Sequence, residues 1–218
     1  MSLFRKSKIP LVAPMEGYRR WAATYRDESN PIKENSDRLI EQWFPGVAGR
    51  DVLDAGCGPG KFCQLAEQRG AAQVTGVDFA PEMISLAKEK CLRTEFLCQD
   101  VSADAFTRES YDLVICALVL GHCEGLVQAL TNLGSSVRPG GLFLITDFHP
   151  TLSQQKAKRT FRDPATGETT EIQHHIHLIN DYTLTLSTLG FVIEELVEPK
   201  WEGQAVVFGI KARKNPTL

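Results

Sequence analysis

The chain has 218 residues, a length that fits one domain, and its 43% hydrophobic and 23% charged residues are typical of a globular protein. The formal net charge of −3 gives no overall basic field for nucleic acid, and no apolar run is long enough to span a membrane. The first residues carry only a short apolar piece, so we do not expect a signal peptide. We expect a single cytoplasmic domain over residues 1–218, a monomer or a homodimer. The six cysteines form no C-x-x-C motif, which indicates reduced thiols and no metal site.

A helical segment is predicted over residues 15–44, ahead of the first strand. Its first helix, over residues 15–27, places Tyr18, Trp21 and Tyr25 on one face. A second helix follows and is predicted to end at a Pro-Gly pair. The aromatic face either packs on the edge of the domain or closes over a ligand.

The stretch from Val52 to Lys61 reads as a short buried strand that runs through a glycine loop into a helix. Its glycines are Gly56, Gly58 and Gly60. Glycine has no Cβ and tolerates positive φ, so such a loop brings backbone N–H groups close to a ligand. The spacing differs from the dinucleotide pattern G-x-G-x-x-G, which argues against a nicotinamide oxidoreductase. Asp54, two residues before the loop, suits a cationic or zwitterionic ligand better than a pyrophosphate.

The next predicted strand, residues 72–77, ends at Asp78, about twenty residues past the loop. Adjacent parallel strands end at the same edge of a sheet, so this carboxylate faces the same crevice as the glycine loop. It can accept hydrogen bonds from ribose hydroxyls there. Phe79 and Met83 follow it and are placed to flank a base ring, although Met83 also fits the core side of a helix.

Three more strands are predicted over residues 94–98, 111–120 and 142–146, with a helix at 126–133 and an R-P-G-G turn at 138–141. The run 111–120 is almost wholly apolar, which is typical of a strand covered on both faces.

Residues 151–179 interrupt this alternation. A basic stretch, a turn and an alternating run over 170–179 predict a strand hairpin inserted over the crevice, where acceptor specificity is usually determined. His174, His175 and His177 lie in it. Because no cysteine or acid completes a ligand set nearby, we favour solvent or acceptor contacts over a metal for these histidines.

A helix over residues 180–189 and two strands over 191–197 and 205–212 are predicted to end the chain. The acid before G-x-G-x-G, the segment Gly76–Ile84 and the R-P-G-G turn resemble motifs of the class I S-adenosylmethionine-dependent methyltransferases. The resemblance implies an α/β fold: a doubly wound, Rossmann-like, seven-stranded and mostly parallel sheet with an antiparallel last strand, here with a small hairpin insert. It also implies S-adenosylmethionine (SAM) as cofactor and S-adenosylhomocysteine (SAH) as product.

The same resemblance assigns residues to parts of the cofactor. The loop would hold the methionine end, Asp78 the ribose and Asp100 the adenine amino group, unless Asp100 merely caps a turn. The aromatic residues of the helical segment would lie over the cofactor. The full set of expected cofactor-binding residues is Tyr18, Trp21, Tyr25, Asp54, Ala55, Gly56, Gly58, Gly60, Asp78, Phe79, Met83, Asp100, Val101 and Ala117.

A hydroxyl acceptor must lose a proton, and His149 and His122 both follow predicted strands on the ligand side. Either is a candidate general base, or else each hydrogen-bonds the backbone and holds a loop; Asp147 is a weaker candidate. The N/D-P-P-Y/F motif of base-amino methylases is missing after the fourth strand. We therefore expect methyl transfer to a small molecule, to oxygen or carbon.

Two alternatives remain open. One is an RNA-modifying methyltransferase, with a basic surface formed by Lys156, Lys158, Arg159 and Arg162. The other is a protein that binds SAM without catalysing a reaction.

Overall fold

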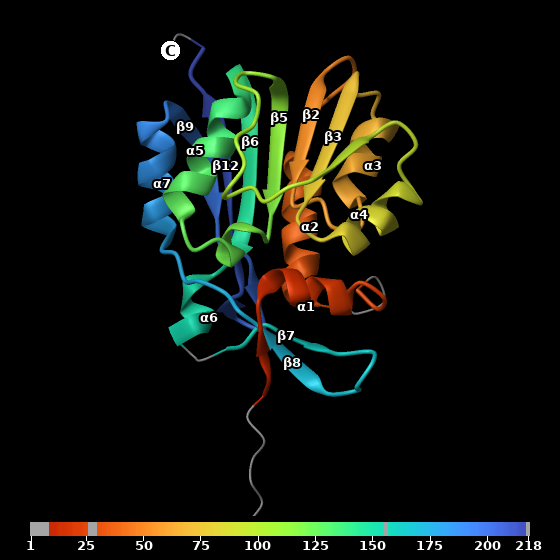
Figure 1. The fold of residues 1–218 in the computed structure, drawn as a ribbon. Helices are drawn as coiled ribbons and strands as arrows, with labels where there is room; N and C mark the ends of the chain where they lie inside the picture. The colour runs from red at the N-terminus through yellow and green to blue at the C-terminus, as the bar shows by residue number, and fades with distance from the viewer. Residues whose placement is uncertain (1–8, 26–29, 155–156, 217–218) are drawn as a thin grey trace, which may run out of the picture.

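A seven-stranded sheet forms the centre of the computed structural model, which describes residues 9–25, 30–154 and 157–216 (Figure 1). The order of the strands across the sheet is β4 (Glu95–Cys98), β3 (Gln73–Asp78), β2 (Asp51–Ala55), β5 (Tyr111–Ala117), β6 (Val137–Phe148), β12 (Val207–Lys214) and β9 (Phe191–Val197). The first five are parallel, whereas β12 runs antiparallel to both β6 and β9. The predicted topology, with an antiparallel last strand, is confirmed.

Helices cover both faces of the sheet because successive strand residues point to opposite sides. Leu53 and Phe143 belong to the core beneath α5 and α7, whereas Val52 and Leu144 belong to the core beneath α2 and α3. The sheet is therefore doubly wound. Its helices are α2 (Pro31–Trp43), α3 (Lys61–Gln68), α4 (Pro81–Lys88), α5 (Leu126–Ser136) and α7 (Ile179–Thr188).

A second layer lies beyond the carboxyl ends of the parallel strands (Figure 1). It consists of α1 (Pro14–Trp21) and a three-stranded sheet in the order β1 (Leu11–Val12), β8 (Thr169–Ile172) and β7 (Thr160–Arg162). Strands β7 and β8 form the predicted antiparallel hairpin, and β1 pairs parallel to β8. A Cβ on Gly17 would lie 2.7 Å from Ile172 Cγ1, so α1 packs closely on the hairpin. The segment before β2 and the insert after β6 therefore cover the same edge of the sheet.

Several predicted boundaries are wrong. The predicted helix over residues 15–27 ends at Trp21; residues 26 and 27 lie outside the described part of the chain. The predicted strand over 111–120 stops at Ala117, because Leu118 takes a positive φ of 59° and a short 3-10 helix, η1 (Leu120–His122), follows. Both departures lie at the edge that the second layer covers.

Other departures are small. The predicted turn at 138–141 lies within β6, and β8 ends at Ile172, so residues 173–178 connect it to α7. Five short elements were not predicted: β1, η1, α6 (Pro150–Gln154), β10 (Lys200–Trp201) and β11 (Gln204–Ala205). No helix in the described ranges is long and apolar enough to cross a bilayer.

Candidate functional site

The glycine loop and the tip of β3 are tied together by the backbone. Gly56 N and Cys57 N both donate to Val77 O, at 2.7 and 2.8 Å. Asp78 accepts from Gly58 N at one carboxylate oxygen and from Ala80 N at the other, each at 2.9 Å. These bonds fix the orientation of the Asp78 carboxylate, while its burial raises its pKa to about 6.

Three connected hollows follow the strand tips. The first, of about 320 Å³, is lined by Asp100, Val101 and Phe79 among others; the second, of about 40 Å³, contains Asp78. The third, of about 180 Å³, lies against the glycine loop and the start of α3. Phe79 lines the first and second hollows, and Gly58 lines the second and third. The three hollows therefore adjoin one another along the sheet edge, and together we call them the channel.

This channel fits an elongated nucleoside with an amino-acid tail. Gly58 has a φ of 50°, and no atom lies within 4 Å of where its Cβ would stand, so the bare backbone faces open space. Beside it Asp78 offers an oriented carboxylate to hydroxyl groups. Asp100 sits in the first hollow, where its Oδ1 also accepts from Ser102 N at 2.8 Å and Ser102 Oγ at 2.6 Å. Asp100 thus caps a turn and lines the channel as well.

The structure brings most of the predicted cofactor-binding residues to this channel. Those that line it are Tyr18, Tyr25, Gly56, Gly58, Asp78, Phe79, Met83, Asp100, Val101 and Ala117. Trp21 lines a separate, neighbouring hollow.

Three predicted residues lie beneath the channel and not on it. Asp54 is buried and accepts a hydrogen bond from Cys63 Sγ at 3.4 Å; burial raises its pKa to about 7. Ala55 is fully buried in the core. A Cβ on Gly60 would lie 2.9 Å from that of Ala87, so this glycine permits helix packing. The sequence pattern did not separate these supporting residues from those that face the hollow.

His122 lies at the channel, but its ring is already engaged. Its Nε2 faces both the Tyr18 hydroxyl at 2.9 Å and Arg159 Nη1, and its Nδ1 lies 3.3 Å from Gln173 O. Because arginine only donates, Nε2 is the acceptor and the proton sits on Nδ1. Burial and the nearby guanidinium lower the pKa of His122 well below its usual value. A neutral histidine bound in this way is poorly suited to take a proton from an acceptor.

The structure places the other predicted base, His149, away from the hollows. Its side chain is buried, with Nε2 2.7 Å from Glu198 Oε2 and Nδ1 2.7 Å from Thr151 Oγ1. It lines none of the hollows described here. The prediction placed it by sequence proximity to a strand end, but its ring is held by the loop before β10. We therefore assign it a structural contact.

Both carboxylate oxygens of Asp147, the weaker candidate for the general base, already accept hydrogen bonds. Gly121 N and the Tyr182 hydroxyl donate to its Oδ2 at 2.6 and 2.8 Å, and Phe148 N donates to its Oδ1 at 2.7 Å. Arg159 Nη2 approaches Oδ1 at 3.3 Å. Asp147 therefore anchors η1 and Arg159, and its oxygens are not available to an acceptor.

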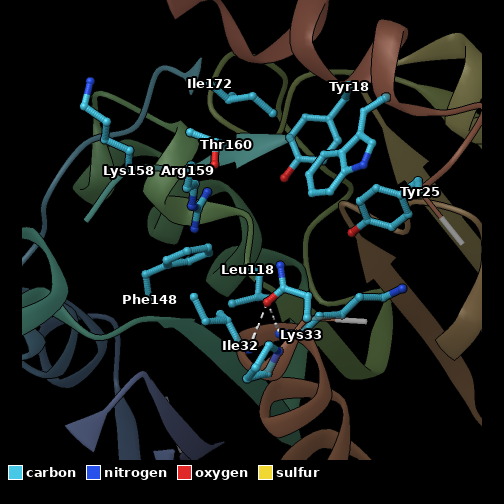
Figure 2. A pocket seen from close by; sticks show the side chains of 13 residues that line it. Tyr18, Tyr25, Ile32, Lys33, Leu118, Phe148, Lys158, Arg159, Thr160 and Ile172 are labelled. Carbon is cyan, nitrogen blue, oxygen red and sulfur yellow. Dashed lines mark hydrogen bonds between the residues drawn. The ribbon is translucent and has the colours of Figure 1, made fainter. Parts of the chain in front are cut away.

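A fourth hollow, of about 370 Å³, lies next to the channel between α1, the start of α2 and the hairpin (Figure 2). It shares Tyr18 and Leu118 with the channel. Leu118, Phe148 and Arg159 line it, yet sequence reasoning assigned none of them to a small-molecule site. Leu118 directly follows the strand tip, which was a usable signal. Arg159 was grouped with a basic surface, and only the tertiary fold turns it inward.

The histidines of the insert do not gather around an ion. His175 N donates to Gly121 O at 2.7 Å, and His177 Nε2 lies 2.8 Å from Cys123 O. Within the described ranges no three His, Cys, Asp or Glu side chains are grouped as metal ligands. These contacts tie the connection after β8 to η1.

Comparison with known proteins relates the central part of the chain to methyltransferase domains, whose family model matches residues 52–141. A malonyl-[acyl-carrier protein] O-methyltransferase of Salmonella typhimurium is 32% identical over 127 residues, 58% of this chain and 50% of that protein. A ubiquinone biosynthesis O-methyltransferase of Coxiella burnetii is 31% identical over 122 residues, 54% of this chain and 50% of that protein. The chain thus spans about half the length of these curated relatives.

Solved structures share the fold over most of the chain. An S-adenosylmethionine dependent methyltransferase from Mesorhizobium loti superposes with a TM-score of 0.69 and 18% identity, covering 84% of this chain and 100% of that one. The N-methyltransferase NodS from Bradyrhizobium japonicum, solved with SAH, gives a TM-score of 0.68 at 16% identity, covering 92% and 97%. At these identities the likeness establishes the architecture alone.

Proposed function

Because residues 52–141 match a methyltransferase domain model, we propose that this protein transfers a methyl group from SAM to an oxygen atom of a small molecule. One observation carries the proposal: both oxygens of Asp78 are held by backbone N–H groups, beside a glycine loop whose backbone faces an open channel. The O-methyltransferase names of the matched relatives support oxygen as the accepting atom.

The residues of the channel would hold SAM in three parts. Asp78 would bind the ribose hydroxyls, while Phe79 and Asp100 would contact the adenine. Gly56 and Gly58 would lie against the methionine end. When bound, SAM supplies a sulfonium-activated methyl carbon. The protein then contributes mainly position and the exclusion of water.

The helical segment over residues 15–44 would act as a cover over both ligands. Tyr18 and Tyr25 line the channel and also the fourth hollow, so they stand between the two. Burial raises the pKa of Tyr18 to about 12, so its hydroxyl stays protonated at neutral pH. All six cysteines are free thiols, which supports the proposal of a reducing, cytoplasmic location.

The structure gives less support to the RNA-modifying alternative. Arg159, one of its four proposed basic residues, is buried at 8% exposure, and Lys158 is paired with Glu171. Of the other two, Arg162 is exposed and Lys156 lies outside the described part of the chain. The described members of this set therefore do not form the continuous basic surface that this alternative needs.

Calorimetric titration with SAM tests the proposal. Replacement of Asp78 by Ala removes a charged acceptor for two ribose hydroxyls, each hydrogen bond worth about 1.5–3 kcal/mol. We expect SAM binding to weaken by about a hundredfold or more. The wild-type affinity should also fall below about pH 6, where the Asp78 carboxylate takes up a proton and stops accepting.

Asp112→Ala is a matched control. Asp112 also accepts a backbone N–H, from Asp51 at 2.9 Å, and pairs with Arg138, but it lies near the amino end of β5. This variant should lose stability and keep its affinity for SAM. Unchanged binding by Asp78→Ala, or no binding of SAM by the wild type, would contradict the proposed function.

A further inference from the structure

The fourth hollow is the space next to the channel in which an acceptor would lie. Its volume of about 370 Å³ is within the range of small-molecule sites, about 300–1,000 Å³. Figure 2 shows Tyr18 and Tyr25 on one side of it and Phe148 on the other, with Arg159 next to Phe148. Ile32, Ile172, Leu118 and Trp21 add apolar surface. The walls therefore suit a small molecule with an apolar body.

The charged side chains among the described residues of this hollow have one sign. Its described lining residues include the cations Lys33, Lys158 and Arg159 but no carboxylate. Lys33 lies 4.8 Å over the ring of Tyr25 and is partly buried, which lowers its pKa. Lys158 pairs with Glu171 outside the hollow. A cationic hollow of this kind attracts and orients an anion.

Arg159 is the most deeply placed of the three cations. Its guanidinium stacks on the ring of Phe148, with Cζ 3.2 Å from the ring centroid. Its Nη1 donates to His122 and its Nη2 reaches Asp147 only at 3.3 Å. Asp147 is therefore the buried ion-pair partner of Arg159, although it also accepts three shorter hydrogen bonds. A buried ion pair is favourable only when the remaining N–H groups are also hydrogen-bonded, so Arg159 has use for a further acceptor.

Two buried donors on this hollow have no acceptor. Within the described residues, neither Arg159 Nε nor Trp21 Nε1 has a hydrogen-bond partner, and both residues line the hollow. Buried N–H groups are almost always paired, so an unpaired one on each of two side chains that line the same hollow favours a ligand with acceptor atoms there. A carboxylate supplies two such oxygens and carries the opposite charge.

The described residues that line this hollow include no histidine that could act as a general base. His122 accepts from Arg159 and Tyr18, and His149 lies elsewhere. A phenol or alcohol would need such a base to lose its proton during transfer. A carboxylic acid is already ionised at neutral pH and needs none.

From this geometry we propose that the methyl acceptor is an organic acid, whose carboxylate is bound by Arg159 and is itself the nucleophile. The inference rests on the proposed function and specifies its substrate class. A carboxylate oxygen forms the bond to the methyl carbon as the carbon–sulfur bond breaks; the electron pair stays on sulfur, giving SAH. The product is a neutral methyl ester, no proton is released, and Arg159 loses its anionic partner when the ester forms.

The test uses pairs of acids and neutral amides of matched shape: phenylacetate with phenylacetamide, cinnamate with cinnamamide, and octanoate with octanamide. Calorimetry with the SAH-loaded protein measures binding, and tritiated SAM measures transfer. A methyl ester releases volatile tritiated methanol in alkali, whereas a methyl group on nitrogen or carbon does not. We expect at least one acid to bind more than tenfold tighter than its amide and to give an alkali-labile product.

Two variants compare cations on the same hairpin. Arg159→Met keeps a long side chain but removes the charge; we expect at least a tenfold loss of acid binding, with SAM affinity unchanged. Arg162→Met is the control, because Arg162 is exposed on β7 and does not line the hollow. If Arg159→Met does not fold, Lys33→Met at the rim replaces it, with a smaller loss of acid binding expected.

The outcomes separate this inference from the proposed function. Failure to bind SAM would reject both. If SAM binds but amides react as well as acids, if no acid binds, or if the product is stable to alkali, the organic-acid assignment is rejected and the methyltransferase proposal stands.

Discussion

Two glycines of the loop and one outside it allow a comparison of three alanine substitutions that differ in their surroundings. Gly56, Gly58 and Gly140 all have positive φ, at 76°, 50° and 78°. Alanine in this conformation costs roughly 1–2 kcal/mol wherever it stands. A Cβ at Gly56 would also lie 2.1 Å from Val119 Cγ2, whereas no atom lies within 4 Å of one at Gly58 or Gly140. Overpacking adds about 1–3 kcal/mol at Gly56 alone.

The expected results follow from these surroundings. Gly56→Ala should lower the free energy of unfolding by about 2–5 kcal/mol, and the other two variants by about 1–2 kcal/mol. Gly58→Ala should also weaken SAM binding by at least about tenfold, since its Cβ enters the channel. Gly140→Ala, at the start of β6, should leave binding unchanged.

Urea unfolding and calorimetric titration of the three variants measure both quantities. The reasoning is refuted if Gly58→Ala binds SAM like the wild type, or if Gly140→Ala weakens binding to the same extent. It is also refuted if Gly56→Ala is no less stable than Gly58→Ala, because the contact with Val119 would then have no energetic consequence.

Two further predictions concern buried ionisable residues. His149→Ala should keep its turnover per folded molecule. Its free energy of unfolding should fall by about 1–3 kcal/mol, because the contacts with Glu198 and Thr151 are lost. A large fall in turnover with unchanged stability would instead support His149 as the general base. Burial raises the pKa of Asp54 to about 7, above its unfolded value near 3.9, so its ionisation opposes folding. Wild-type stability relative to Asp54→Asn should therefore decrease from about pH 4 to about pH 7 and level off above; a constant difference in urea unfolding across this range would contradict the assignment.

The strand pattern could be predicted because it depends on local chemistry. Apolar runs such as Val52–Ala55 and Tyr111–Ala117 are buried on both faces, and the acids and glycines after them mark the edge where parallel strands end. A strand end was predicted wrongly where tertiary contacts stop the strand before its apolar sequence pattern ends. Leu118 continues the apolar pattern but turns to positive φ, and its N–H donates to Thr146 O on the neighbouring strand.

The sequence by itself determined the order of elements, the sheet and the edge at which a nucleoside would bind, because hydrophobic periodicity and glycine spacing act over short distances. It also placed Asp78 at a strand tip beside the glycine loop, and the structure confirms that position. Which histidine faces a ligand, and where Arg159 points, was decided by the tertiary structure alone. These side chains take their direction from partners far along the chain: His149 from Glu198, and Arg159 from Asp147 and His122. The sequence pattern shows that such groups are present, whereas packing determines which of them are left without a partner at a cavity.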